Sequence, residues 1–522
     1  MKKANYSKLF MSMCCLVLLS GCGFIKPEPL TLQERQDYIE EDKKLREKYS
    51  IDIKGPMTLY DAMARTILAN TDYQVQRMEK VVANGEFEKA KLEMLPELRA
   101  TGSYAYRDPQ SASKSVNLDT GEVSTGGYTS SEEKERFLGD VTFSWNLLDF
   151  GLSYYQAKQQ ADAVLVRHEM QRKVLQNLMV KVRYAYWKAY FAQFFEPKVV
   201  AILAETRVAL EKSKKTEQLR LRPPMETLRY QRALYEIISQ LENLKSELDL
   251  AKIELRTLID APFGAKLTLL APGNPDKEKL NATFPELKDM IDLALNQRPE
   301  VRQAMYQARS SSYEVRKAIL KMLPGLELKA ALNYDSNTYL RDNSWSNLWA
   351  HVTGNIMDIL TAPTRIEHAE STVNLAEHRR LAVHVAVISQ VQIAVRQYSD
   401  SIASSQRAKA ISNIDAKMNT LMKNEVSSSA GNPLESIRQD ASALFSELNH
   451  YKRYAEAHNS YGRVVMSMGL DMLPGADLSV MSFNELRNKL MLTQNFAMMD
   501  VKGLVNRHKL AMMLENPKDE EK

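Results

Sequence analysis

The sequence predicts an α+β membrane protein in which membrane-crossing strands join very long helices, all built from two internal repeats. Three observations predict this class: segments that recur at a fixed spacing, long stretches without helix breakers, and four segments of about ten residues that alternate apolar and polar side chains. The 522 residues include only 19 Gly and 18 Pro, which favours long uninterrupted elements.

The chain begins with a segment typical of a secretory leader. A lysine-containing start precedes a mostly apolar stretch of about ten residues, which Leu19-Ser20-Gly21-Cys22 closes. This end resembles the bacterial lipobox, so we expect a signal peptide over 1–21, a covalent lipid on Cys22 and a lipid-anchored tether over 22–56. The following residue is Gly23, and its resemblance to lipoprotein sorting signals favours the outer membrane. All three cysteines lie in this region, which leaves the folded body without a disulfide or a thiolate metal site.

Composition limits how the chain can meet a membrane. Charged residues make up 26% of the chain, and no apolar run of about 18 residues occurs. Any membrane crossing must therefore use strands. Without the three leader lysines the net charge is 5 minus 3, or +2, too balanced to suggest nucleic acid as a partner.

Two long parts of the sequence repeat each other. Met94-Leu95-Pro96 recurs as Met322-Leu323-Pro324, 228 residues later (324 minus 96). Asn146-Leu147-Leu148-Asp149 matches Asn355-Ile356-Met357-Asp358, 209 residues later (355 minus 146). The first copy therefore has 19 extra residues between these motifs, in a polar stretch that we interpret as a longer loop. The predicted parts are a first repeat at 57–260, a linker at 261–284, a second repeat at 285–470, and a C-terminal equatorial segment and tail at 471–522.

Each copy contains the same order of elements. A helical segment, at about 57–94 or 285–322, ends at a Leu-Pro pair because proline stops helices. Two strands follow, then a helix of roughly 65 to 70 residues, a proline-marked turn and a helix of roughly 37. At 1.5 Å per residue the longest helix would reach about 100 Å, so these helices should pack side by side as a coiled-coil cylinder.

The four strands are expected at about 98–107, 137–147, 326–335 and 347–356. In the second of them, Phe137, Val141 and Phe143 share one face while Asp140 and Thr142 share the other. Apolar-out and polar-in alternation matches transmembrane barrel strands, although a soluble antiparallel sheet with one wet face shows the same pattern. Four strands cannot close a barrel, and open edges are very costly in lipid, so several chains would share one barrel.

We find no catalytic constellation. HExxH, GxSxG and Gly-rich phosphate-loop motifs are absent from the sequence. His368, His378 and His384 share one predicted helix, but their spacing does not keep them on one face. We therefore predict no enzyme, no metal and no cofactor beyond the lipid on Cys22.

Several motifs, in this order and twice over, resemble the TolC family of outer membrane factors across about 57–474. They are the helix start at Leu59 and Asp61, the helix end Leu95-Pro96, the strand end Trp145 to Gly151, and Glu226-Thr227-Leu228 with Gln231. The resemblance implies a homotrimer with a 12-stranded transmembrane β-barrel, four strands per chain, continuous with a periplasmic tunnel of long helices. It also implies partners: a periplasmic adaptor protein, an inner-membrane pump and outer-membrane lipid.

The function implied is an outer-membrane exit channel of a tripartite efflux or secretion system, which conducts small molecules such as drugs or metals passively. The location implied is the cell outer membrane, with lipid anchoring, membrane-spanning strands and a large periplasmic portion. Two alternatives stay open: an exit duct for type I protein secretion, and a non-conducting envelope scaffold lipoprotein.

Acidic residues follow the proline-marked turns. Glu226 and Glu435 stand where the family's hairpin motif usually has Asp, and Asp440 lies about one turn beyond Glu435. In a trimer a residue facing the axis appears three times, so these carboxylates are candidates for a cation-attracting periplasmic aperture. The alternative is a structural role, because acidic residues stabilise the first turn of a helix.

The turns themselves are the candidate adaptor-docking sites by resemblance. They contain Arg220, Arg222, Pro223 and Pro224 in the first copy and Gly431, Asn432 and Pro433 in the second. Family turns often carry a glycine, which only the second copy keeps. A dense group of aromatic residues on the first long helix is expected to be core packing, with a partner surface as the alternative; its members are Tyr184, Tyr186, Trp187, Tyr190, Phe191, Phe194 and Phe195.

Overall fold

The computed structural model describes residues 28–49, 51, 53, 55–262, 264–271, 282–427, 433–471, 473 and 481–497. The chain divides into two units, Met1–Asp52 and Ile53–Lys522. In the first, helix α2 (Leu32–Tyr49) is held at its start by Thr31, whose backbone N–H donates to the Glu34 carboxylate at 2.7 Å. The predicted signal peptide and Cys22 lie outside the described residues.

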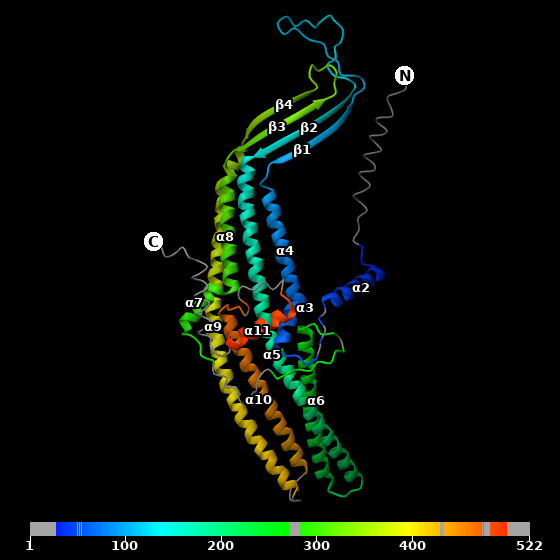
Figure 1. Cartoon of the computed structure of the whole chain (residues 1–522), viewed down its shortest axis with the longest axis vertical. Coiled ribbons are helices and arrows are strands. Elements are labelled where there is room, and N and C mark those ends of the chain that lie inside the picture. Colours follow the sequence, from blue (N-terminus) through cyan, green and yellow to red (C-terminus); the bar gives the residue numbers. More distant parts are fainter. Residues whose placement is uncertain are drawn as a thin grey trace. The chain divides into compact units, whose positions relative to one another are not determined.

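The second unit contains helices that occur in pairs of equal length (Figure 1). Residue counts of 11, 22, 72 and 35 each occur in both halves. The two halves therefore carry helices of the same four lengths in the same order. The elements of the unit are α3 (Leu59–Ala69), α4 (Thr71–Leu92), β1 (Glu97–Tyr106), β2 (Glu135–Asn146), α5 (Leu147–Gln218), α6 (Pro224–Leu258), α7 (Leu287–Gln297), α8 (Pro299–Leu320), β3 (Gly325–Asp335), β4 (Ser344–Thr353), α9 (Ile356–Ser427), α10 (Pro433–Ser467) and α11 (Phe483–Ala497).

The helices next to the sheet lie side by side in the same order as the strands to which they connect. The sheet is antiparallel with the order β1-β2-β3-β4. Next to it, α4 packs on α5, α5 on α8, and α8 on α9. Strands β2 and β4 lead into the long helices α5 and α9, and an asparagine side chain caps each start. Asn146 accepts from Leu148 N–H at 3.0 Å, and Asn355 accepts from Met357 N–H at 3.0 Å.

The helical segments expected at 57–94 and 285–322 are each two helices, which corrects the prediction. Asn70 interrupts the first segment, because its backbone is extended and its side chain accepts from Tyr73 N–H at 3.2 Å as the cap of α4. Pro299 interrupts the second, because proline disfavours the helical conformation in the residue before it, and Arg298 is extended. Helix caps and proline sterics therefore override a continuous helical pattern.

The strand expected at about 347–356 is displaced towards the N-terminus and runs over Ser344–Thr353 as β4. Its last expected residues are lost because Asn355 caps α9 and Ile356 is already helical. Its first residues are gained because Ser344 pairs with Tyr334 and Ser346 with Leu332 of β3. Alternation continues across both ends, so it could not fix the boundaries.

The aromatic group of α5 is core packing for the most part, as expected. Trp187 stacks on Phe191 with ring centroids 5.4 Å apart, and on His458 of α10 at 4.9 Å. The same cluster joins α5, α6 and α10 below the middle of the unit. Phe194 is the exception, since its side chain is exposed. Further clusters pack α3 and α11 on α5, and α7 on α9 and α10.

Candidate channel wall and helical tips

The four-stranded sheet has one polar and one apolar face. Residues that pair directly in an antiparallel sheet lie on the same face. One row of such pairs runs Arg99, Thr142, Ala331, Asn347, and the next row contains Thr101, Asp140, Asn333 and Trp345. The opposite face carries exposed apolar side chains from all four strands, among them Leu98, Tyr104, Phe137, Val141, Leu332, Leu348 and Val352.

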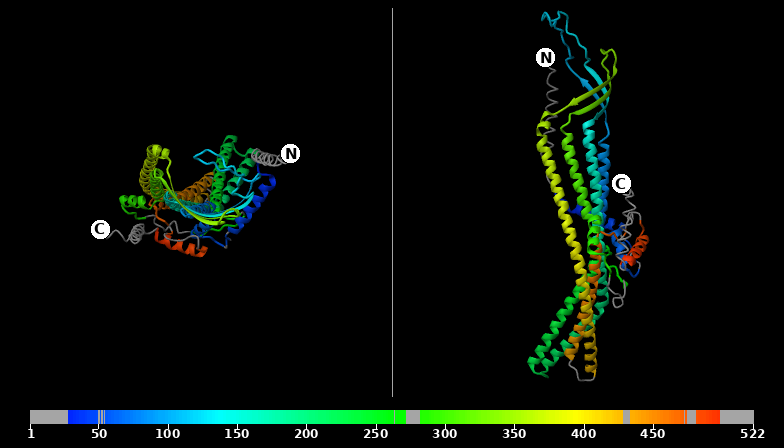
Figure 2. Two further views of the ribbon diagram at one scale, coloured as in Figure 1. Left: turned by 90° about the horizontal axis from the view of Figure 1, so that it is seen from above. Right: turned by 90° about the vertical axis from the view of Figure 1, so that its left-hand side faces the viewer.

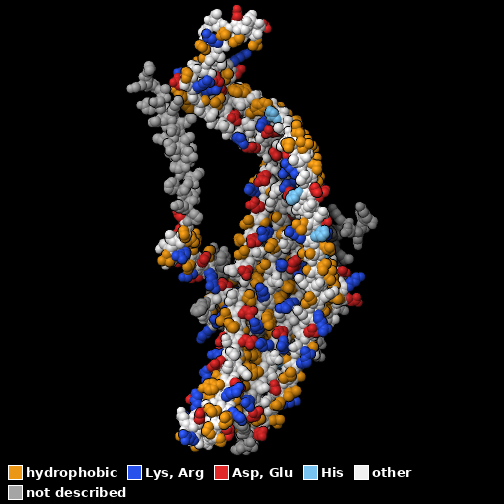
Figure 3. Space-filling model, turned by 180° about the vertical axis from the view of Figure 1, so that it is seen from behind, with side chains coloured by type: hydrophobic (Ala, Val, Ile, Leu, Met, Phe, Trp, Pro, Cys, Tyr) orange, Lys and Arg blue, Asp and Glu red, His pale blue; other side chains and the backbone are white. Residues whose placement is uncertain are grey.

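The sheet is curved (Figure 2), and in β2 and β3 the residues of its polar face are less exposed than those of its apolar face, which places the polar face on the concave side. Ala331 on the polar face is 4% exposed, whereas Leu332 and Leu348 on the apolar face are 66% and 83% exposed. The space-filling view from behind shows hydrophobic side chains mixed with charged and other side chains at the upper end of the second unit (Figure 3). A curved wall that is polar inside and apolar outside can line a wet pore while it meets lipid.

Both lateral edges of this wall are open within the chain. In the described residues, β1 pairs with β2 alone and β4 with β3 alone, which leaves one row of backbone groups on each edge strand. The edge helices carry exposed apolar side chains as well: Val75, Met78 and Val82 on α4, and Leu381 and Val385 on α9. Sheet and helices are thus open at the same two sides.

The tip of the α5–α6 hairpin brings the predicted docking residues of the first copy together. Arg220 has φ 50°, and Leu221 N–H donates to Thr216 O at 3.1 Å, the arrangement that usually places glycine after a helix. Pro223 and Pro224 then begin α6. Exposed apolar side chains surround this cationic turn; they are Leu219, Leu221 and Met225.

The α9–α10 hairpin is described up to Ser427 and again from Pro433. Gly431 and Asn432 lie outside the described residues, and Pro433 begins α10. Asp440 is buried between the two helices, where its carboxylate accepts from the Asn419 amide at 2.9 Å and pairs with Lys423 Nζ at 2.7 Å.

The three acidic candidates therefore have different surroundings. Glu226 and Glu435 are exposed in the first turns of α6 and α10, 3.5 Å from Arg222 and 3.7 Å from Arg438 respectively. Asp440 is enclosed and tied to its own hairpin. Sequence reasoning missed the partners of Asp440, because Lys423 lies on the other helix and no local motif connects them.

Neither a membrane-spanning helix nor a metal cluster emerges from the described residues. No helix there is both long and apolar enough to cross a membrane. No group of three or more His, Cys, Asp or Glu side chains there is arranged to hold a metal ion.

The fold matches solved outer-membrane channels. The Campylobacter jejuni outer membrane channel CmeC aligns with a TM-score of 0.63 at 13% identity, over 92% of this chain and 95% of that one. The Neisseria gonorrhoeae outer membrane channel MtrE aligns at 0.61 and 13% identity, over 79% and 88%. The Vibrio cholerae outer membrane protein VceC aligns at 0.59 and 12% identity, over 79% and 96%.

This chain has the outer-membrane channel fold. The resemblance to TolC-type outer membrane factors is confirmed at the level of the fold. No family model and no curated protein matches the sequence. These channels share only 12–13% of their residues with this chain.

Proposed function

We propose that this chain is a TolC-type outer membrane factor, the outer-membrane exit channel of a tripartite efflux system that conducts small molecules passively. The observation that carries this proposal is the curved sheet with an apolar outer face, a polar inner face and two open edges. No covalent step is involved, because the wall needs only to hold a wet path across the membrane.

The open edges call for further copies of the chain. Each unpaired backbone group costs several kcal/mol in lipid, so pairing β4 of one copy with β1 of the next removes a large penalty. Such head-to-tail contacts close into a ring. Three copies would give the twelve strands of a homotrimer, and the same rotation would set α9 against the next copy's α4, covering apolar residues on both.

The remaining parts take roles that follow the resemblance. The lipid on Cys22 would add an anchor in the outer membrane. The tips of α5–α6 and α9–α10 would dock a periplasmic adaptor and, with it, an inner-membrane pump. Glu226 and Glu435, exposed at these tips, would form the cation-attracting aperture, while Asp440 would hold its hairpin closed.

Single-channel conductance of the purified full-length protein in a planar bilayer tests the proposal. We expect steady, cation-preferring current, and reduced cation preference in the Glu226→Gln/Glu435→Gln variant. Glu370→Gln, an exposed carboxylate far from the tips, is the matched control. Blockade of the current by an unfolded polypeptide, but not by small organic ions, would favour the protein-secretion duct. An inserted oligomer that stays silent both as wild type and as the double variant would favour the scaffold.

A further inference from the structure

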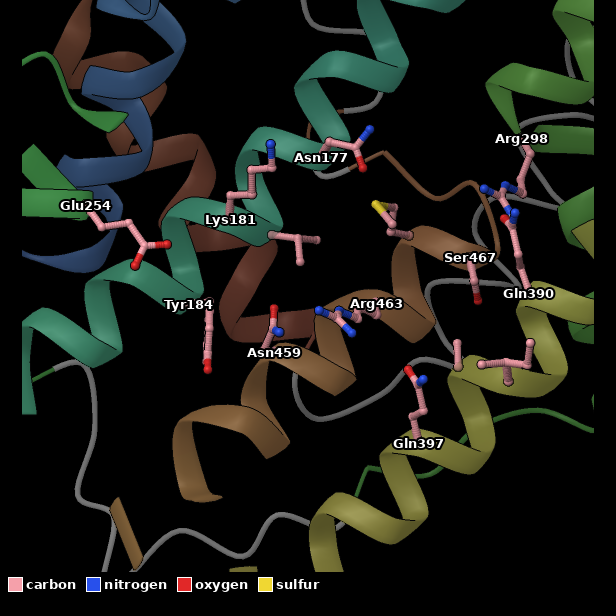
Figure 4. A pocket seen from close by; sticks show the side chains of 14 residues that line it. Asn177, Lys181, Tyr184, Glu254, Arg298, Gln390, Gln397, Asn459, Arg463 and Ser467 are labelled. Carbon is pink, nitrogen blue, oxygen red and sulfur yellow. The ribbon is translucent and has the colours of Figure 1, made fainter. Parts of the chain in front are cut away.

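A cleft opens in the second unit where α10 ends between α5 and α9 (Figure 4). It encloses about 400 Å³, within the range of small-molecule sites. Three cations and one carboxylate line it: Lys181 from α5, Arg298 before α8, Arg463 from α10, and Glu254 from α6. Amide side chains supply most of the other polar groups, among them Asn177 and Asn459.

The charges in the cleft are not balanced. Glu254 pairs with Lys188 at 2.7 Å, and Arg298 pairs with Glu300 at 3.2 Å. Lys181 and Arg463 are exposed and form no ion pair with any described residue. The cleft therefore holds two cations that have no paired carboxylate among the described residues.

A further cation, Arg183, is buried close to the cleft. Arg183 is 2% exposed, and its Nε and Nη1 atoms have no hydrogen-bond partner among the described residues. It faces α10 next to Arg463: a Cβ added at Gly462 would meet Nη1 at 3.8 Å. A buried guanidinium without a carboxylate beside it makes the local potential positive.

The cleft opens towards the inner side of the wall. On α5, Asn177, Lys181 and Tyr184 face the cleft, whereas Met179 and Tyr186 pack towards α3 on the opposite side of the helix. Seen from above, α11 lies on the convex side of the sheet (Figure 2, left). The side away from α3 and α11 is thus the side that the polar face of the sheet encloses.

We propose that this cleft binds the anionic group of a small organic molecule, a carboxylate or a phosphate, through Lys181 and Arg463. Two cations that line one cleft together with amide donors suit such a group, because hydrogen bonds to charged partners are the strong ones. Binding needs only the cleft. That the ligand is cargo in transit rests on the proposed exit channel.

Fluorescence anisotropy with two dyes of similar size tests this site in the detergent-solubilised full chain at low salt. Carboxyfluorescein supplies carboxylates, and rhodamine 6G is a cation. We expect saturable binding of carboxyfluorescein that weakens about tenfold or more in Lys181→Gln/Arg463→Gln. The matched control, Lys212→Gln/Arg229→Gln, removes two exposed cations far from the cleft and should bind like the wild type.

Charge reversal separates a binding role from a structural one. In Lys181→Glu/Arg463→Glu the preference should switch from carboxyfluorescein to rhodamine 6G, while the circular dichroism spectrum stays unchanged. Equal carboxyfluorescein binding by the wild type and both cleft variants, or no binding by the wild type, would overturn the proposal. Conductance without dye binding would contradict only the proposed binding site. Dye binding without conductance would contradict only the proposed exit channel.

Discussion

The hairpins α5–α6 and α9–α10 have the same lengths, 72 and 35 residues, but they end differently. The first ends in a cationic turn surrounded by exposed apolar residues, with Arg220 in a left-handed conformation. The second encloses Asp440 between its helices. The two hairpins therefore have the same helix lengths, while the residues near their tips differ. The first tip exposes its cationic and apolar side chains, whereas Asp440 and Lys423 link the two helices of the second hairpin.

The opposite ends of the hairpins differ as well. After α6, the residue in the left-handed conformation is Asp260, which has φ 45° and is not a glycine. After α10, Gly469 takes φ 73°, and a Cβ there would lie 2.6 Å from the Arg298 backbone nitrogen. The second half thus depends on a close backbone approach, which only glycine permits.

The largest effect should come from Gly469→Ala. The added carbon meets backbone atoms of Gln297 and Arg298 in a left-handed conformation, so we expect a loss of about 3 kcal/mol or more in the free energy of unfolding. Gly462→Ala is the control: its Cβ finds ordinary contacts, and alanine favours the helix by up to about 1 kcal/mol. Thermal denaturation compares them, and an unchanged midpoint for Gly469→Ala would show that the approach is not tight.

The packing of α10 against α5 should become less stable in acid. His458 of α10 stacks on Trp187 of α5, and burial, with a smaller contribution from Arg183, lowers the pKa of His458 to about 3. The unfolded chain takes up a proton here near pH 6.5, but the folded chain does not until about pH 3. Stability should therefore fall as the pH drops through this window, by about 2 kcal/mol at pH 5.

Denaturation at pH 7 and pH 5 measures this effect. His458→Phe should lose that part of the acid sensitivity, whereas the exposed His378→Gln should keep it. Equal acid sensitivity in His458→Phe would assign the effect to other groups.

A smaller change should follow Asp440→Asn. The substitution keeps the shape but removes the pair with the half-exposed Lys423, which we expect to cost about 1 kcal/mol. Hydrogen exchange at the α9–α10 tip should then be about fivefold faster, with the α5–α6 tip unchanged. Glu435→Gln, at an exposed pair in the same helix, should leave both tips unchanged. Faster exchange at both tips would mean that the hairpins are coupled.

The smallest effect has the opposite sign. Arg220→Gly relieves a left-handed side-chain conformation and should stabilise the α5–α6 tip by up to about 1 kcal/mol. A thermal midpoint that rises slightly would confirm the strain, and a lower one would show that the Arg220 side chain stabilises the turn.

The sequence predicts those features that depend on periodicity. Alternation predicted the two faces of the sheet, and the scarcity of Gly and Pro predicted long helices, although Pro197 lies inside α5 and Pro363 inside α9. Features that depend on one contact were missed. Asn70 and Arg298 break the first helices through caps and proline sterics, and the Asp440–Lys423 pair joins two helices without a local motif. The cleft was also missed, because four separate helices, α5, α6, α9 and α10, assemble it together with Arg298.

The central claim is that β1 and β4 are edges only until other copies pair with them. Hydrogen exchange of the full chain in lipid tests it at the amides of β1 and β4 that are not bonded to β2 or β3. The account predicts that these amides exchange as slowly as those of β2 and β3, in an assembly whose mass is that of three chains. Fast exchange at the two edge strands, with β2 and β3 protected, would contradict it.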